Sequence, residues 1–515
     1  MGALSIKTAK VLVTLIASSS FLANGGPIAQ PAVNKTPPAF YGTSVSSEPL
    51  SKTTVDHNPY LAEEGVNGMH GNTYNTDTYD YAGPLGKNPV VKSRSLNTFG
   101  GLAATTVFDS KGRLICISGG LAGFKLLLLD PDSLEVLAST TLPQRKSTEE
   151  FFRTLDFDLI TSDTSGGAYF HLLDGDRPLI GNSENVLQIY KVDDRGRTPV
   201  WTVEREYDLQ PYLTSDETIT DAIPDWTGRI WFITRQGTVG TVDPETEKVR
   251  KVRLKSEEIQ NTLAVAKDGT YIVSDHAMYR YKATRDGSPK EMWRKVYDRG
   301  STLKPGAINQ GSGTAPTLLD VPVTSGKNKG KTVKTVAVTD NADGKVNLLV
   351  YNRKDGSLIV KQPLFTEGKS VSENSIVANG RSFIIENNYS EHGAGFLSDN
   401  PESEPGITRV DLNSTVTGGK VVWTSKEASP TVVAKLSTGS GLLYAYTRVQ
   451  NKDIDEDTVA WYFTAIDFKT GKTKYKVFTG TGINWNNSYA PITIGPNGNA
   501  YVGVFNGIIS IADTK

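Results

Sequence analysis

Three side chains in the sequence belong to types that move protons in enzymes: His70, His276 and Glu373. His70 lies in a segment rich in tyrosine and asparagine, and His276 follows an apolar run that ends at Asp275. An unperturbed imidazole titrates near neutral pH, so either histidine could act as a general base. The carboxyl group of Glu373 could act as a further general acid or base. We therefore predict these three as candidate catalytic residues.

Further polar side chains recur shortly before predicted strands, where they could bind a ligand. They stand roughly seven to eleven residues ahead of a series of turn glycines, or slightly further in one repeat, and are Asp156, Asp158, Asp221, Asn261, Thr314, Glu373, Asn374, Asn487 and Tyr489. Because Ca²⁺ takes about six to eight oxygen ligands, a candidate calcium set is Asp221, Asn261, Glu373 and Asn374. The other interpretations are a site for a hydroxylated ligand and a structural role as hydrogen-bonding caps of the strands.

Several other motifs are excluded by their spacing. No two of the five histidines lie three to five residues apart, so a zinc-protease helix is absent, and His171 is expected to pack inside a strand. The basic turn after Gly326 has one residue too few between its glycines for a phosphate-binding loop. No Gly-x-Ser-x-Gly motif supports a nucleophile elbow. The single cysteine, Cys116, excludes an intrachain disulfide, and its apolar neighbours predict a buried, unreactive thiol.

The elements that must position these residues follow from a repeat that begins after residue 97. Each copy has a short apolar strand, a turn through glycine, a second strand of aromatic and β-branched residues, and a third strand that ends near an aspartate. The turn glycines are Gly112, Gly166, Gly228, Gly269, Gly326, Gly380, Gly441 and Gly498. Their mean spacing, (498 − 112)/7 or about 55 residues, is of the order found in repeat proteins.

Eight copies of an antiparallel sheet predict an all-β protein, an eight-bladed β-propeller, because radial closure leaves only short strand edges. The last copy ends at Asp513 with no room for an outer strand. The strand-like segment Pro89–Leu96 precedes the first copy, so we predict that it closes the ring from the N-terminal side. Seven blades are the alternative, because the stretch Ser325–Thr332 distorts the fifth turn.

A propeller brings the beginnings of its innermost strands together at the mouth of the central channel. The polar residues named above stand at those strand beginnings in separate blades, so only closure of the ring would join them. We therefore predict one pocket at the channel mouth, built from several blades.

Two stretches resemble blade motifs of known propellers: Asp225–Phe232, read Asp-Trp-Thr-Gly-Arg-Ile-Trp-Phe, and Ala465–Lys472, read Ala-Ile-Asp-Phe-Lys-Thr-Gly-Lys. They look like motifs of the quinoprotein-like propellers and of the SMP-30-like and lactonase propellers. The latter hold calcium with a Glu, Asn, Asn and Asp set, which the candidate calcium residues match in type. Quinoprotein alcohol dehydrogenases use a pair of adjacent cysteines and this chain has one, so the resemblance implies the fold more than a quinone cofactor.

The N-terminal residues predict secretion. Lys7 and Lys10 precede the apolar run Val11–Ala23, which is too short to span a bilayer and is typical of a signal peptide. Acceptor patterns for N-glycosylation begin at Asn34, Asn388, Asn413 and Asn486. We therefore expect a secreted, extracellular protein.

Composition shifts divide the chain into four parts. We predict a signal peptide at 1–25, a flexible leader rich in Pro, Ser and Thr at 26–56, a Tyr- and Asn-rich segment with the closing strand at 57–96, and the propeller at 97–515.

The charge balance narrows the class of partner. The chain carries 55 Lys and Arg against 56 Asp and Glu, and a net charge of −1 gives no overall field for nucleic acid or an anionic membrane. We expect a monomer whose partner is a small-molecule ligand or substrate. The function predicted is a secreted enzyme that acts on a small organic substrate at the channel mouth, by hydrolysis, elimination or cyclisation. The alternative is a noncatalytic extracellular propeller that binds a ligand or serves as a scaffold. The cofactor stays unknown, with calcium as the candidate.

Overall fold

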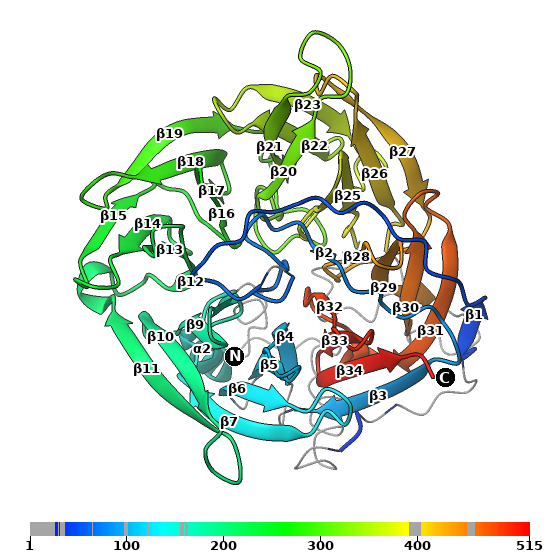
Figure 1. Cartoon of the computed structure of the whole chain (residues 1–515), viewed down its shortest axis with the longest axis horizontal. Helices are drawn as coiled ribbons and strands as arrows, with labels where there is room; N and C mark the ends of the chain where they lie inside the picture. The colour runs from blue at the N-terminus through cyan, green and yellow to red at the C-terminus, as the bar shows by residue number, and fades with distance from the viewer. Residues whose placement is uncertain are drawn as a thin grey trace.

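The computed structural model describes residues 26–28, 30, 37–63, 65–96, 101–120, 123–154, 159, 163–390, 403–450 and 459–514. These residues form eight antiparallel sheets, called blades here, around a central channel. Figure 1 shows the ring viewed down its axis. The prediction of an eight-bladed β-propeller is confirmed, and the alternative of seven blades is wrong.

Blades 1 to 4 follow one another along the chain, each with its innermost strand first. Their strands are β4 (Leu102–Phe108), β5 (Leu114–Gly120), β6 (Gly123–Leu129) and β7 (Val136–Leu142); β8 (Phe170–Leu173), β9 (Arg177–Gly181), β10 (Val186–Asp193) and β11 (Val200–Asp208); β12 (Ile219–Pro224), β13 (Ile230–Thr234), β14 (Thr238–Val242) and β15 (Val249–Arg253); β16 (Ala264–Ala266), β17 (Gly269–Val273), β18 (Ala277–Ala283) and β19 (Pro289–Val296).

Blades 5 to 8 continue the ring, and blade 8 takes its outer strand from the N-terminal region. Their strands are β20 (Thr317–Pro322), β21 (Thr332–Thr339), β22 (Asn347–Asn352) and β23 (Leu358–Pro363); β24 (Val377–Asn379), β25 (Ser382–Glu386), β26 (Ile407–Leu412) and β27 (Gly419–Ser425); β28 (Lys435–Ser437), β29 (Leu442–Gln450), β30 (Val459–Asp467) and β31 (Thr473–Thr481); β32 (Ile492–Ile494), β33 (Ala500–Val504), β34 (Gly507–Ala512) and β3 (Val90–Ser95).

Burial explains why the inner strands are continuous apolar runs. A middle strand such as β13 is covered on both faces by neighbouring blades, and all of its residues are buried. An outer strand such as β11 has one face in solvent, so buried and exposed residues mix along it. The hydrophobic core therefore lies between the blades.

The ring closes as the sequence predicts. Strand β3 pairs antiparallel with β34, from Val90 opposite Ala512 to Ser95 opposite Gly507. The final blade thus has four strands, and the edge of β34 is covered.

The expectation of a flexible leader over 26–56 does not hold for its described part. Strand β1 (Phe40–Gly42) pairs with the outer strand β31 of blade 7, with Phe40 opposite Val477. Ile28 is only 4% exposed and belongs to the core. Backbone hydrogen bonds from Glu48 and Leu50 to the turn after β28 extend this contact. The outer strand β31 of blade 7 has a free edge, and the backbone of β1 pairs with it. This pairing orders the segment.

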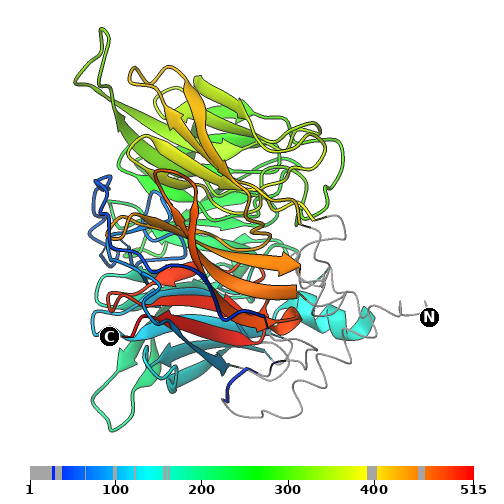
Figure 2. The same ribbon diagram turned by 90° about the vertical axis from the view of Figure 1, so that its right-hand side faces the viewer.

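Residues 61–79, called the inner segment here, pass along the channel wall. The segment accepts backbone hydrogen bonds from the innermost strands of blades 2, 4, 5, 6 and 7, through the carbonyls of Asn67, Thr73, Tyr74, Thr76 and Asp77. It ends in the short strand β2 (Thr78–Tyr79), which pairs parallel with β28. Figure 2 shows helix α2 (Lys146–Thr154) on one face of the ring and most, but not all, of the blue part of the chain on the other.

Blade 2 departs from the predicted repeat. The sequence interpretation takes Gly166 as the hairpin turn and residues 168–172 as the second strand. In the structure β8 is the innermost strand, and the hairpin turns through Gly175 at φ +74°. Both stretches are apolar strands next to glycine, so composition does not separate them. Helix α2 and the 3₁₀ turns Gln210–Tyr212 and Ile483–Trp485 were also not expected.

Candidate functional site

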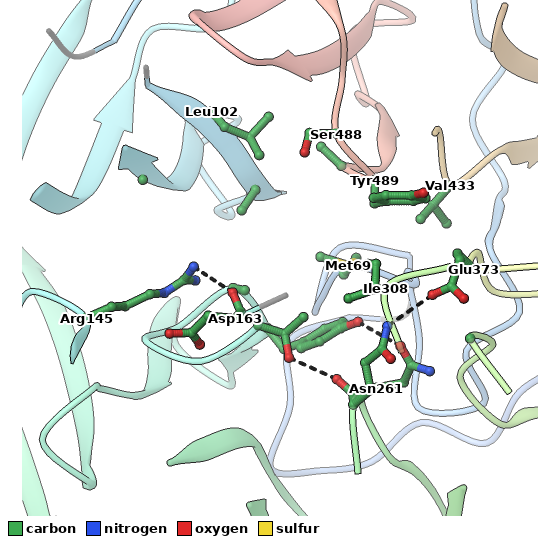
Figure 3. A pocket seen from close by; sticks show the side chains of 18 of the residues that line it. Met69, Leu102, Arg145, Asp163, Asn261, Ile308, Glu373, Val433, Ser488 and Tyr489 are labelled. Atoms are coloured by element: carbon green, nitrogen blue, oxygen red, sulfur yellow. Dashed lines mark hydrogen bonds between the residues drawn. The ribbon is translucent and has the colours of Figure 1, made fainter. Parts of the chain in front are cut away.

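One cavity of about 170 Å³ lies at the end of the channel where the innermost strands begin. Its wall comes from blades 1, 2 and 4 to 8, mostly from the segments that lead into these strands. The inner segment adds Met69 and His70 to the wall. Figure 3 shows this cavity from close by.

A chain of hydrogen bonds opens on this cavity. The Ser375 hydroxyl lies 3.2 Å from His70 Nε2, and His70 Nδ1 lies 2.9 Å from Asp77 Oδ1. Ser375 and His70 both line the cavity, and Asp77 is fully buried behind them. Lys435 at the start of β28 donates to the same oxygen of Asp77 and, at 2.6 Å, to the carbonyl of Met69.

The local backbone explains how Asp77 returns to His70. Asn75 and Asp77 adopt left-handed conformations with φ +54°, and the Asp77 N–H donates to the His70 carbonyl at 3.2 Å. Asparagine and aspartate tolerate this region better than most residues. The Asn- and Asp-rich composition of this stretch therefore permits the tight loop that joins the two side chains.

The environment keeps His70 neutral. Burial lowers the pKa of His70, and the neighbouring Asp77 carboxylate opposes that effect without cancelling it. Burial also lowers the pKa of the Lys435 ammonium, which Asp77 partly offsets. With the Nδ1 proton directed at Asp77, the free pair of Nε2 faces the Ser375 hydroxyl. This is the tautomer that a general base for Ser375 requires.

Glu373 and Gln260, called the acceptor pair here, occupy another part of the wall. Gln260 Nε2 donates to Glu373 Oε2 at 3.1 Å. Burial raises the pKa of Glu373 to about 8, although the Gln260 hydrogen bond acts in the opposite direction. The carboxyl group of Glu373 is therefore mostly protonated near neutral pH when the cavity is empty.

The end of the cavity away from Glu373 carries a guanidinium group. Arg145 donates to the Asp163 carbonyl at 2.7 Å and lies 4.3 Å from the centre of the Phe124 ring. In Figure 3, Arg145 and Glu373 lie on opposite sides of the view. Between these polar ends the wall is largely apolar, and includes Leu102, Ile308, Val433 and Ala490. The cavity suits a small organic molecule with polar ends.

Four residues predicted from the sequence lie in the wall of this cavity: His70, Asn261, Glu373 and Tyr489. Asn261 Oδ1 accepts a long hydrogen bond from Tyr169 at 3.4 Å, and the Tyr489 hydroxyl donates to the Gly306 carbonyl at 2.8 Å.

Other predicted ligand-binding residues hold the backbone instead of facing the cavity. Thr314 Oγ1 accepts from the Thr339 N–H, and the Asn487 amide donates to the Ala490 carbonyl. Asn374 donates to the Val432 carbonyl. These contacts match the structural alternative stated for such side chains.

The four candidate calcium ligands do not converge. Asp221 Oδ2 contacts His171 Nε2 at 3.2 Å and accepts from Thr262, while its Oδ1 accepts from the Ala222 N–H. Asp221 and Asn374 are absent from the wall that Asn261 and Glu373 line. Within the described ranges, no group of three or more His, Cys, Asp or Glu is arranged to hold a metal ion. The residues present therefore do not fit the calcium set.

His276 does not belong to the cavity. Its Nδ1 contacts the adjacent Asp275 carboxylate at 2.8 Å, and its side chain is 32% exposed. The structure therefore places His276 outside this cavity, and a catalytic role for it stays a prediction. Asp156, Asp158 and His392 lie outside the described residues.

Two predicted glycosylation sites are inaccessible. Asn388 and Asn486 are each 1% exposed, and Asn388 donates to the carbonyls of Ser429 and Pro430. N-glycans are bulky surface groups, so this burial argues against glycans at these two residues in the folded chain. Asn413 is exposed in the turn after β26, and Asn34 lies outside the described residues.

Sequence reasoning missed Ser375, Asp77, Lys435, Gln260 and Arg145. Ser375 stands two residues after Glu373, and Asp77 stands in the same Tyr- and Asn-rich segment as His70. Those positions were the available signals. Lys435 and Gln260 carry none, because an isolated lysine or glutamine near a strand is common on protein surfaces.

A quinone cofactor does not fit these residues. Cys116 lies in β5 and is completely buried. This burial raises the pKa of its thiol to about 12. It is absent from the cavity wall.

No family model matches the chain. An uncharacterized protein of Archaeoglobus fulgidus is 25% identical over 363 residues, covering 63% of this chain and 67% of that protein. A quinoprotein ethanol dehydrogenase of Pseudomonas aeruginosa is 29% identical over 163 residues, which cover 31% of this chain and 21% of the enzyme. This chain thus matches about a fifth of that enzyme's length.

Solved structures similar to this chain include BamB from Moraxella catarrhalis, at 11% identity and TM-score 0.34, covering 66% of this chain and 94% of BamB. A functionally unknown protein from Desulfotomaculum acetoxidans has 11% identity and TM-score 0.36, covering 70% of this chain and 95% of that one. The quinoprotein match fits the resemblance to quinoprotein-like propellers. The finer resemblance to SMP-30-like and lactonase propellers is not shown. The chain is a β-propeller.

Proposed function

We propose that this protein is a hydrolase that cleaves esters or amides of small organic acids, with Ser375 as nucleophile. The observation that carries the proposal is the hydrogen-bond chain from Ser375 through His70 to Asp77, which begins at the cavity wall. The same three residue types in the same order of contact activate serine in unrelated folds. The cavity of about 170 Å³ limits the substrate to a small molecule.

The geometry supports a two-step acyl transfer. The Ser375 oxygen attacks the substrate carbonyl while His70 Nε2 accepts the hydroxyl proton. That proton then passes to the leaving alcohol or amine as its bond to the carbonyl breaks, and an acyl-serine remains. Water, deprotonated by His70, hydrolyses the acyl-serine and restores the hydroxyl. Asp77 stabilises the imidazolium that forms in each step.

Each partner of His70 has a distinct part in this scheme. The lowered pKa of His70 keeps it able to accept a proton near neutral pH. Lys435 donates to the same Asp77 oxygen that His70 contacts and holds the carboxylate in place. Ser375 is 5% exposed, so attack takes place in a site that excludes bulk water.

The experiment compares three variants with the wild type on p-nitrophenyl esters of short acids. Ser375→Ala and His70→Gln should each lower kcat by about 10³-fold or more. Ser372→Ala is the matched control, because Ser372 is also buried, three residues away, and does not line the cavity. A fluorophosphonate should label Ser375 in the wild type, as read by peptide mass spectrometry. Unchanged hydrolysis by Ser375→Ala would overturn the proposal and favour the noncatalytic ligand-binding propeller.

We propose in addition that the protein is secreted, on the support of the Lys7, Lys10 and Val11–Ala23 pattern, which lies outside the described residues. Among the described residues, no helix has the length and apolar character to cross a membrane. N-terminal sequencing of protein from the producing cells should find a start near residues 24–30. Recovery of chains that begin at Met1 would contradict secretion.

A further inference from the structure

Two buried acceptor atoms in the cavity wall have no hydrogen-bond partner among the described residues, Oε1 of Glu373 and Oε1 of Gln260. The two residues are 6% and 4% exposed. The hydrogen bond from Gln260 Nε2 to Glu373 Oε2 orients both side chains and leaves the other oxygen of each for a further donor. An unsatisfied buried acceptor destabilises the empty site, and a ligand that donates hydrogen bonds would recover that loss.

Neighbouring segments hold the acceptor pair in position. The Glu373 N–H donates to Asn388 Oδ1 at 2.7 Å. A Cβ atom at Gly313 would lie 2.5 Å from Glu373 Cδ, so only glycine there lets the loop before β20 pack against the carboxyl group. Glu373 is therefore fixed before a ligand arrives, which reduces the entropy lost on binding.

The number of acceptors selects the donor. A hydroxyl group donates one hydrogen, whereas a primary ammonium donates three and neutralises the Glu373 carboxylate. A calcium ion would need about six to eight oxygens, far more than the acceptor pair offers. We infer that the acceptor pair binds the primary ammonium group of the substrate that Ser375 attacks, an inference that rests on the proposed hydrolase function.

The position of Ser375 sets the substrate class. Glu373 and Ser375 are two residues apart and both line the cavity. The chain bends at Asn374 between them, and a cavity of about 170 Å³ leaves room for only a short link between the ammonium group and the attacked carbonyl. The substrates are therefore esters or amides of short amino acids, such as those of glycine or β-alanine.

Binding is linked to a proton. Because burial raises the pKa of Glu373 to about 8, the empty site holds a protonated carboxyl at pH 7, and an ammonium ligand expels that proton. Arg235, in the turn after β13, is the charged group that acts on Glu373, and it favours the ionised form. His70, which also lines the cavity, is kept neutral by burial. Affinity for an ammonium ligand should rise from pH 6 to pH 8.

The first test measures binding without hydrolysis. Calorimetry with n-butylammonium chloride, in buffers of different ionisation enthalpy, should show binding with release of a proton at pH 7. Glu373→Gln should weaken binding by about tenfold or more and abolish the proton release. Ser375→Ala should bind n-butylammonium as the wild type does, so this measurement is independent of the proposed chemistry.

Glu386→Gln is the matched control for this binding test. Burial raises the pKa of Glu386 to about 8 as well, but its oxygens accept from Ser429 Oγ and the Ala434 N–H, and it does not line the cavity. The control should therefore bind n-butylammonium unchanged. Equal loss in Glu373→Gln and Glu386→Gln would overturn the inference.

The second test compares the p-nitrophenyl ester of β-alanine with p-nitrophenyl butyrate, which has a methyl in place of the ammonium. The wild type should prefer the amino ester in kcat/KM by about tenfold or more, and Glu373→Gln should lose this preference. Absence of preference in the wild type, or displacement of n-butylammonium by calcium chloride, would overturn the inference. If Ser375→Ala still hydrolyses both esters, the hydrolase proposal fails while the binding result stands.

Discussion

Glu373→Gln should make the protein more stable at neutral pH and remove part of the pH dependence of its stability. The folded-state pKa of Glu373 is raised from 4.5 to about 8 because the carboxyl is buried. Between these two values the native chain keeps a proton that the unfolded chain has lost. The free energy of unfolding therefore falls as pH rises through this window, by about 1.4 kcal/mol per pH unit. Glutamine carries no such proton and has no such slope.

The size of the effect follows from that slope. From pH 5.5 to 7.5 the stability of Glu373→Gln should gain about 2.7 kcal/mol relative to the wild type. An unfolding entropy of about 2.1 cal/mol/K per residue gives about 1.1 kcal/mol/K for a chain of this length, so the difference in Tm should grow by about 2–3 °C. The lowered pKa of His70 gives a pH dependence of the opposite sign, but His70 is present in both proteins and its contribution cancels in the comparison.

Differential scanning calorimetry of the two proteins at several pH values between 5.5 and 7.5 measures this difference. Glu386→Gln should show a gain of similar size, since its carboxyl is equally buried and its pKa is also raised to about 8. Parallel curves for the wild type and Glu373→Gln would refute the reasoning, because they would mean that Glu373 is ionised and solvated in the folded chain.

Three further predictions concern the ring. Gly503→Ala should lower stability by about 2 kcal/mol or more, because the new Cβ would lie 1.9 Å from the Ala103 carbonyl oxygen where blades 8 and 1 meet. Gly344→Ala is the control and should leave stability unchanged, because there is open space around Gly344. Thermal unfolding of both variants measures the difference. Arg353→Met should lower the free energy of unfolding by about 3 kcal/mol, because Arg353 is fully buried and pairs with Asp268 and Asp320. Denaturant unfolding measures this loss, and a loss near zero would contradict the pairing. Deletion of β3 should expose the edge of β34 and give aggregation or a much lower Tm in light-scattering and melting experiments, and a propeller of unchanged Tm would contradict closure by that strand.

The fold could be predicted from the sequence because its signal repeats. Turn glycines recur eight times, and strand composition recurs with them, so an error in one copy leaves the others intact. Blade 2 shows the limit. Its first two strands are both short and apolar, and the glycines at 166 and 175 are equally plausible turns. In the structure the sheet order β11-β10-β9-β8 puts β8 at the inner edge, where it also pairs with the inner segment through Gly68 and His171.

The site was predicted only in part, because its contacts join residues that are far apart in the sequence. Position in the repeat pointed to Asn261, Glu373 and Tyr489, and residue chemistry pointed to His70. The partners of His70 and Asp77 could not be predicted, because Ser375 lies 305 residues from His70, and Lys435 lies 358 residues from Asp77. Neither distance leaves a pattern in one sequence. The burial of Asn388 and Asn486 could not be predicted either, since a short acceptor pattern carries no information about burial.

One N-terminal region both closes the ring and completes the candidate site. Strand β3 covers the outer edge of blade 8, and the inner segment, which ends eleven residues before β3, brings His70 and Asp77 to the channel mouth. Ser375 leads into blade 6 and Lys435 begins the innermost strand of blade 7. The proposed nucleophile and its base therefore lie 305 residues apart in the chain, and they meet only when the blades have closed around the inner segment. A hydrolytic activity of this site should accordingly appear with the folded ring and not with any fragment of it.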